Sequence, residues 1–245
     1  MMAIIKRIKS IPNAILGYER SDPYRNGEYK FLNSYIINNM TIIDVGAHDG
    51  TYTEYIFKLN PSVNIHCFEP TAIAFKELTV KLENEIKAGK LVANNLGLST
   101  EIGEAELFIY NELDQRNSLH LNPAHTYDSS LLHKEKIKLT TLDDYIERNK
   151  ISRVDFLKID VEGHETKVIE GAASSLKKKI IKCIQFEYNN NWAAAGFTLE
   201  NVFKYLKRND FKIFRLTIWG KIPIYRFKLK LENYIHSNYI SLLSE

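Results

Sequence analysis

Three acidic side chains in this sequence stand at or next to the ends of short apolar runs. They are Asp44, Glu69 and Asp160. Short apolar runs bounded by turn residues are typical of buried strands. If these strands are parallel, their carboxyl ends meet at one edge of the sheet, which is where ligands bind in such folds. We therefore expect the three carboxylates to belong to one site.

The segment after the third run carries groups that could accept a proton. Asp160, Glu162 and His164 alternate along the chain, and carboxylates and imidazoles are the usual general bases. Alternate residues of an extended segment point to one side, so we expect all three to face the same cavity. They are the candidate catalytic residues. The alternative is structural: a loop-holding carboxylate, a first-turn helix acid and a surface imidazole.

A metal ion is a rival use of the same edge. Glu187 and Asn189 follow the next predicted strand, and with Asp160 they would offer oxygen ligands suited to magnesium or calcium. The histidines and cysteines have no zinc-type spacing. We favour a site without a metal.

A glycine turn follows the first strand. Gly46 and Gly50 bracket the sequence GAHDG between an apolar run and a helical pattern. Glycine lets backbone approach a ligand, and free N–H groups at a helix start attract anions. The pyrophosphate-binding pattern G-x-G-x-x-G is absent. S-adenosylmethionine, which has no pyrophosphate, fits this turn better than NAD.

Glu69 strengthens the cofactor hypothesis. It lies 19 residues after Gly50, and an acidic residue at the tip of the second strand can accept both ribose hydroxyls. Asp44 would face the cofactor's ammonium group. Clustered carboxylates repel each other, and the sulfonium and ammonium would supply the balancing positive charge. The candidate cofactor-binding residues along the turn and the strand tips are Asp44, Gly46, Ala47, His48, Gly50, Glu69, Pro70 and Asp160.

Four segments together resemble a known family. DVGAHDG, CFEP, TTLDDYI and FLKIDVEGHE, in this order, resemble the FkbM methyltransferases over roughly residues 24–240. The resemblance implies S-adenosylmethionine-dependent transfer to a hydroxyl of a sugar, glycan or small-molecule natural product. It also implies that Asn95, after the third strand, contacts the adenine. The alternatives are an NAD(P)-linked oxidoreductase and a scaffold without catalysis.

The arrangement of the patterns predicts the fold class. Strands alternating with helices indicate an α/β Rossmann-like fold, a mostly parallel seven-stranded sheet with helices on both faces. We expect an N-terminal helical appendage over residues 1–22 and a methyltransferase domain over residues 23–245. An insertion at residues 111–135 should face the substrate, because long loops are often functional. Glu28 is expected to be a solvated first-turn residue, with a role in lining the cofactor site as the alternative, and residues 238–243 are expected to form an edge strand.

Composition excludes several other classes. A net charge of +3 is too small to indicate nucleic acid as a partner. Apolar stretches are too short and interrupted for a membrane span, although residues 1–16 could contact a membrane surface weakly. Cys67 and Cys183, the two cysteines, fall in predicted strands and read as buried thiols, which indicates a reducing, cytoplasmic setting. The sequence does not specify an oligomeric state.

Overall fold

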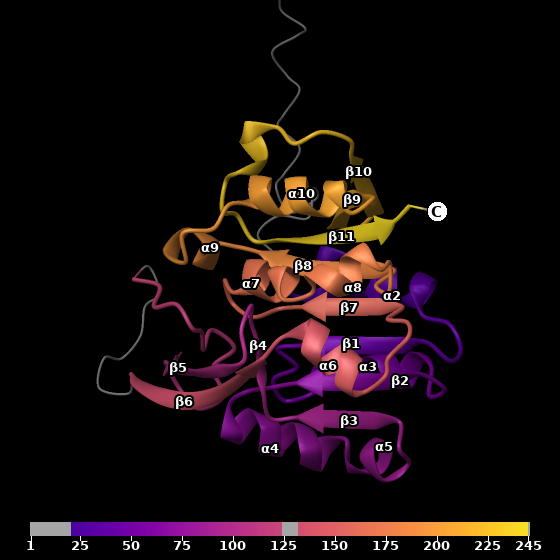
Figure 1. Ribbon diagram of the computed structural model, residues 1–245, viewed down its shortest axis with the longest axis vertical. Helices are drawn as coiled ribbons and strands as arrows, with labels where there is room; N and C mark the ends of the chain where they lie inside the picture. The colour runs from indigo at the N-terminus through magenta and orange to yellow at the C-terminus, as the bar shows by residue number, and fades with distance from the viewer. Residues whose placement is uncertain (1–20, 124–131, 245) are drawn as a thin grey trace, which may run out of the picture.

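The main sheet has eight strands. The computed structural model describes residues 21–123 and 132–244, and its main strand order is β10-β9-β11-β8-β7-β1-β2-β3 (Figure 1). The bounds are β1 (Thr41–Val45), β2 (Asn64–Phe68), β3 (Leu91–Asn94), β7 (Phe156–Ile159), β8 (Cys183–Tyr188), β9 (Phe211–Thr217), β10 (Gly220–Ile224) and β11 (Ser237–Leu243).

The sheet confirms the predicted Rossmann-like class. From β3 to β8 all neighbours are parallel, which brings their carboxyl ends to one edge. β11 is antiparallel to both β8 and β9, and β10 extends the predicted seven strands to eight through a hairpin with β9. The expectation that residues 238–243 form an edge strand is wrong. Tyr239 and Ile240 are fully buried because the strand lies between two others.

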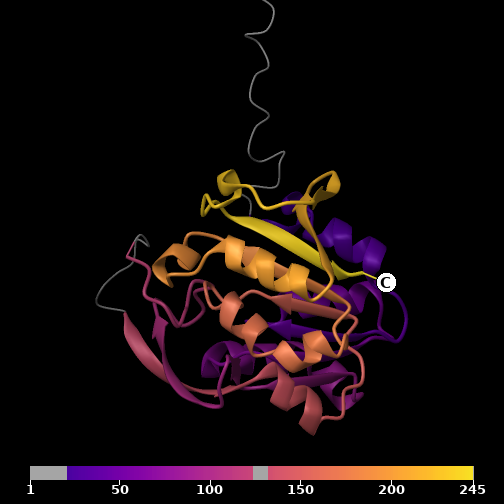
Figure 2. The same ribbon diagram turned by 45° about the horizontal axis from the view of Figure 1, so that its top comes forward.

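Helices cover both faces of the sheet (Figure 2). One core contains Ile42, Ile65 and Leu78, beneath α2 (Glu28–Tyr35), α3 (Thr51–Leu59), α4 (Ala72–Lys81) and α5 (Glu83–Lys87). The other contains Val168, Leu176 and Phe203, beneath α6 (Leu142–Arg148), α7 (Glu165–Glu170), α8 (Ala173–Lys177) and α10 (Leu199–Arg208). The remaining helices are α1 (Pro23–Asn26), α9 (Asn191–Ala194) and the 3₁₀ helix η3 (Leu229–Leu231).

A second sheet stands beside the carboxyl edge of the first. It consists of β4 (Gly97–Leu98), β6 (His133–Thr140) and β5 (Gly103–Ile109), with a small core of Leu107, Ile109 and Ile137. The predicted insertion connects β5 to β6, and its residues 124–131 lie outside the described residues, as do residues 1–20 of the predicted appendage. Within the described chain, no helix is both long and apolar enough to cross a membrane.

Candidate active site

The glycine turn is fastened between two neighbouring strands. The N–H groups of Gly46 and Ala47 donate to the Phe68 carbonyl at 2.9 and 3.0 Å. Gly46 has a φ of +78°, and a Cβ there would lie 1.8 Å from the Asp160 carbonyl oxygen. The absence of a side chain at Gly46 makes room for the residue that follows β7, and this close contact brings the tips of β1, β2 and β7 together.

Glu69 holds the other side of the turn. Its Oε2 accepts from the His48 N–H at 2.9 Å, and its Oε1 accepts from the N–H and the hydroxyl of Thr71 at 2.9 and 2.7 Å. The residue is 5% exposed, and burial raises the pKa of the carboxyl. The carboxylate is therefore fixed in position at the tip of β2.

An apolar cavity opens beside Glu69. It encloses about 650 Å³, open solvent included. Most of its wall consists of apolar side chains from the end of β2 and from the second sheet, which includes β4. The wall includes Phe68, Pro70, Leu96, Leu98, Leu107, Leu119 and Ile137. Glu69 is the buried carboxylate on this wall, so the cavity suits a flat apolar group that carries hydroxyls at one end.

A polar cavity lies on the other side of the β7 tip. It encloses about 1610 Å³ by the same measure, and carboxylates, amides and two tyrosines dominate its wall. The polar members include Glu28, Tyr29, Tyr52, Arg116, Lys158, Glu187, Asn189, Asn190, Asn191 and His236. Both cavities share Gly46, His48, Gln115, Asp160 and Glu162 as lining residues. The carboxylates of Asp160 and Glu162 therefore stand at the boundary between the apolar cavity and the polar cavity.

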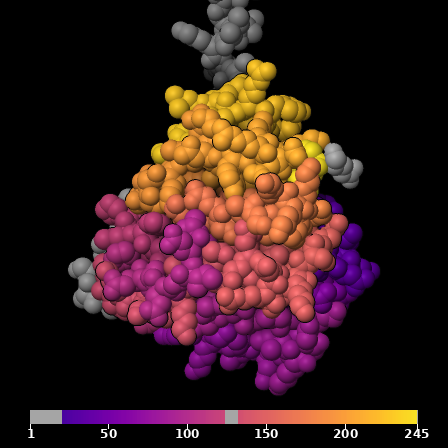
Figure 3. Space-filling model, in the orientation of Figure 1, coloured from indigo at the N-terminus to yellow at the C-terminus, as the bar shows by residue number. Residues whose placement is uncertain are grey.

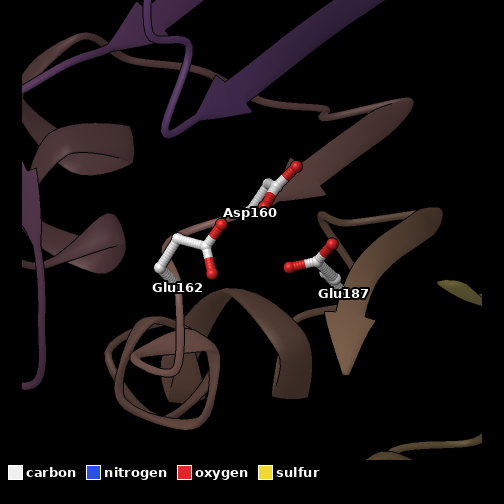
Figure 4. A group of neighbouring side chains, drawn as sticks. All are labelled: Asp160, Glu162 and Glu187. Atoms are coloured by element: carbon white, nitrogen blue, oxygen red, sulfur yellow. The ribbon is translucent and has the colours of Figure 1, made fainter. Parts of the chain in front are cut away.

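Three carboxylates converge at that boundary. Figure 4 shows Asp160, Glu162 and Glu187 pointing toward one another, and one oxygen of each lies within 4.8 Å of the others. The predicted metal alternative paired Asp160 and Glu187 with Asn189. In the structure, Asn189 donates its amide N–H to Glu187 at 2.7 Å and to Glu162 at 3.1 Å. Its nitrogen, a donor, faces the acids.

The chain supplies its own balancing charge. Lys158 is 4% exposed, and its Nζ lies 2.9 Å from Asp160 Oδ2 and 4.6 Å from the Tyr52 ring centroid. His236 Nε2 pairs with Glu187. Although burial alone would lower it, the pKa of His236 rises to about 9 through the adjacent Glu187 carboxylate. Two of the three clustered acids, Asp160 and Glu187, therefore have a cationic partner within the chain.

The loop after β7 is not extended. Glu162 has a φ of +53° and Gly163 a φ of +101°. Buried Glu165 holds this turn by accepting from the N–H groups of Val161 and Gly163, each at 3.0 Å. The expected extended conformation is therefore wrong, because left-handed residues break the alternation. Asp160, Glu162 and His164 nevertheless all line the apolar cavity.

His164 consequently has a different environment from the two acids. Its Nε2 lies 3.0 Å from Ser99 Oγ, and its Nδ1 lies 3.1 Å from His120 Nε2. Burial lowers the pKa of His164 to about 3. It touches the apolar cavity as a neutral ring, whereas Glu162 lines both cavities.

Comparison with known proteins decides the family. The model of the methyltransferase FkbM domain matches residues 44–213, which include the turn, Glu69 and the three clustered acids. This protein belongs to the FkbM methyltransferase family.

Two curated proteins illustrate the relationship. Methyltransferase 1 of Beauveria bassiana is 26% identical over 143 residues, covering 53% of this chain and 57% of that protein. Hexuronic acid methyltransferase AglP of Haloferax volcanii is 27% identical over 135 residues, covering 55% and 50%. The matches thus span little more than half of either relative. The crystal structure of a methyltransferase FkbM from Methylobacillus flagellatus KT shares the fold, with a TM-score of 0.54 and 14% identity over 83% of this chain and 43% of that one.

Three of the predicted cofactor-binding residues of this FkbM domain make contacts within the protein. Asp44 is fully buried, and its Oδ2 accepts from the Thr53 hydroxyl at 2.7 Å. Gly50 packs against Leu78 of α4 and against Leu82, which lies between α4 and α5. Asn95 donates to the carbonyls of Glu69 and Pro70, both at 3.0 Å. These three residues line neither cavity, whereas the other predicted residues do.

Glu28 corrects another expectation. It is 6% exposed and accepts from Gln185 Nε2 at 2.5 Å and from Asn238 Nδ2 at 3.1 Å. Burial raises the pKa of its carboxyl to about 7. The first-turn position predicted solvation. The fold instead brings the Glu28 side chain against Gln185 of β8 and Asn238 of β11, so this glutamate lies inside the polar cavity.

The described part of the FkbM domain's insertion contributes to the walls of both cavities. Gln115 lines both cavities, and Arg116 lines the polar one. Ser118 anchors the segment by donating its hydroxyl to the Glu162 carbonyl at 2.7 Å. The roles of Lys158, Glu165 and His236 at this site were not predicted from the sequence. Two of these residues could have been identified from the sequence. Lys158 is a charged residue within the apolar run FLKI, and Glu165 is the last residue of the distinctive VEGHE segment.

Proposed function

We propose that this protein transfers a methyl group from S-adenosylmethionine to a hydroxyl of a sugar-containing acceptor. The observation that carries the proposal is the pair of cavities that meet at Asp160 and Glu162. One has apolar walls and a fixed carboxylate, and the other is rich in hydrogen-bonding groups. A two-substrate transfer needs this division, because the two reactants must meet in line at the reacting carbon.

The apolar cavity fits the nucleoside of the cofactor. Its hydrocarbon walls suit an adenine, and the Glu69 carboxylate, fixed by three hydrogen bonds, suits the two ribose hydroxyls. The amino-acid end would then lie near the glycine turn and Asp160. When bound there, S-adenosylmethionine supplies an electrophilic methyl group on a positively charged sulfur.

The polar cavity fits a sugar. Carboxylates accept hydrogen bonds from hydroxyl groups, and amides both donate and accept them, so this wall suits the many hydroxyls of a sugar. A relative named for methylation of hexuronic acid supports this class of acceptor.

Glu162 is the best placed group to receive the hydroxyl proton. Its Oε2 accepts from Asn189 and Asn191, so the side chain is held at the boundary of the two cavities. Burial, reinforced by Glu187 and Asp160, raises the pKa of this carboxyl well above its ordinary value. A higher pKa makes the ionised carboxylate a stronger proton acceptor.

Asp160 and His164 fit the role of base less well. Lys158 and neighbouring positive charge lower the pKa of Asp160 despite its burial, and its carboxylate is already occupied by the Lys158 ammonium. His164, with a pKa near 3, binds protons weakly and is turned toward Ser99 and His120. We assign Asp160 to the positioning of Lys158 and of the cofactor's cationic end.

Titration calorimetry with S-adenosylhomocysteine and with NAD tests the cofactor. We expect one site for S-adenosylhomocysteine and no heat from NAD. Incubation with methyl-labelled S-adenosylmethionine and a panel of methyl glycosides, uronic acids and nucleotide sugars tests the acceptor, with a sugar methyl ether as the expected product. Binding of NAD alone would indicate an oxidoreductase, and binding without transfer to any acceptor would favour a scaffold.

A further inference from the structure

A basic segment lies far from the catalytic residues in sequence. Residues 211–231 contain six lysines and arginines and no aspartate or glutamate, although the whole chain has a net charge of only +3. The segment runs from β9 through β10 to η3, at the yellow end of the molecule in Figure 3. Positive charge is thus concentrated at one end of the molecule.

A groove follows this segment. It is lined by ten residues and encloses about 1380 Å³, open solvent included. Arg215, Arg226, Lys228 and Lys230 contribute four cations to its wall, and no carboxylate lines it. The apolar part of the wall comes from β10, Tyr225 and Leu231. The combination suits an anionic group attached to hydrocarbon.

The cations of this groove differ from most others on the surface. On the helices, exposed lysines pair with acids, as Lys58 does with Glu54 and Lys204 with Glu200, each at 2.9 Å. Among the residues that the structure describes, Arg226, Lys228 and Lys230 form no ion pair. Their positive charge is therefore available to an external partner.

The acidic residue that follows η3 does not neutralise them. Glu232 accepts from the N–H groups of Leu199 and Glu200 at 3.0 and 3.1 Å, and from the Tyr188 hydroxyl at 2.9 Å. Its carboxylate is therefore committed to the start of α10.

Large apolar side chains are interleaved with the cations. Tyr225 and Leu229 are each 80% exposed, beside Arg226, Lys228 and Lys230. Aromatic and aliphatic side chains next to lysine and arginine are typical of protein surfaces that lie in the headgroup region of a bilayer. A nucleic acid would use the cations and the tyrosine, but an exposed leucine offers no face for base stacking.

We propose that residues 225–230 dock this protein on an anionic phospholipid membrane. The cations bind lipid headgroups, and Tyr225 and Leu229 enter the interface between headgroups and acyl chains. The inference is independent of the proposed methyl transfer and of residues 1–16, because it rests on described residues of the C-terminal third alone.

Sedimentation with vesicles tests the proposal on the full chain. Vesicles of phosphatidylcholine alone are compared with vesicles that also contain phosphatidylserine. The test variant is R226E/K228E/K230E, and the control is K76E/K177E/K178E, which changes the net charge equally at exposed lysines elsewhere. Each basic residue near an anionic surface adds about 1 kcal/mol, so the test variant should bind at least roughly tenfold more weakly. The control variant should bind like the wild type.

The apolar contribution has its own variant. Y225S/L229S should weaken binding that survives high salt, since salt screens the cations and leaves burial of apolar groups. Circular dichroism checks that every variant is folded. Equal loss in test and control variants, or no preference for anionic vesicles, would overturn the proposal. Tighter binding of a single-stranded RNA oligomer than of vesicles, lost in R226E/K228E/K230E, would assign the groove to nucleic acid instead.

Discussion

The two cavities at the carboxyl edge of the sheet differ in how they are stabilised. The apolar cavity is walled by side chains that also belong to the hydrophobic cores, such as Phe68, Leu98 and Ile137. The polar cavity brings Glu28, Lys158 and Glu187 out of bulk water, and each is compensated by partners from other elements. Burying charge is costly unless it is paired, so the polar side is held together by a network.

This difference separates binding from chemistry. A residue of the apolar side is expected to change cofactor affinity, because it contacts the nucleoside in reactant and transition state alike. A residue at the shared boundary is expected to change the rate. Variants on each side test whether affinity and rate can be changed separately, and the variant with the largest expected effect comes first.

Glu162→Gln keeps the shape of the side chain and removes its basic oxygen. We expect the transfer rate to fall by roughly 10²–10⁴-fold, the usual contribution of a positioned base. Affinity for S-adenosylhomocysteine should change little. Glu200→Gln, at an exposed helix position, is the control. A fully active Glu162→Gln enzyme would remove Glu162 from the chemistry.

Gly46→Ala tests how the turn is packed. The added Cβ would meet the Asp160 carbonyl, and φ is +78°, so we expect a loss of about 3 kcal/mol in unfolding free energy. Urea unfolding measures it. Gly103→Ala is the control, since a Cβ there has no neighbour within 4 Å. Equal stabilities of the two variants would show that the contact with β7 is relaxed in solution.

Glu69→Ala tests the apolar side. It removes the acceptor for the ribose hydroxyls, and S-adenosylhomocysteine should bind about 1–3 kcal/mol more weakly by calorimetry. Thr71→Ala is the matched control, because it removes one donor to Glu69 and leaves the carboxylate. A loss of affinity in Thr71→Ala as large as in Glu69→Ala would mean that Glu69 acts only by holding the turn.

His236→Gln tests the charge network through pH. His236 faces Glu187, Asp160 and Glu28, and its pKa is raised from 6.5 to about 9 in the folded protein. Its stabilisation is therefore complete below pH 6.5 and disappears as the pH rises through 9. From pH 6.5 to pH 9.5 the wild type should lose about 2 kcal/mol more unfolding free energy than His236→Gln. His133→Gln, at an exposed position, should behave like the wild type. Parallel pH curves for wild type and His236→Gln would contradict the ion pair.

Chelation should have the smallest effect. Lys158, His236 and the Asn189 amide already satisfy the three clustered acids, so EDTA should leave the transfer rate unchanged. A rate that EDTA abolishes and magnesium restores would assign Asp160, Glu162 and Glu187 to a metal.

The part of the site formed by strand tips could be predicted from the sequence. Glu69 and Asp160 directly follow β2 and β7 of a parallel sheet, and that topology alone brings them to one edge. Asp44, predicted with them, lies inside β1 and lines neither cavity. The direction of each side chain could not be predicted. Glu162 and His164 diverge because the turn contains left-handed residues, a conformation that only Gly163 suggested.

The residues that pair with the buried acids could not be predicted from the sequence either. His236 and Glu187 are 49 positions apart in the sequence and meet only because β11 returns beside β8. Glu28 carried the pattern of a solvated helix start, and its burial depends on Gln185 and Asn238 from two distant strands. Local patterns therefore identified the acids without the long-range contacts that hold them.

A crystal structure with S-adenosylhomocysteine would show whether the cofactor occupies the apolar cavity. We predict adenine between Phe68 and Ile137, ribose hydroxyls on Glu69, and sulfur at the boundary formed by Asp160 and Glu162, facing the polar cavity. A nucleoside bound in the polar cavity, or a sulfur turned away from Glu162, would contradict it.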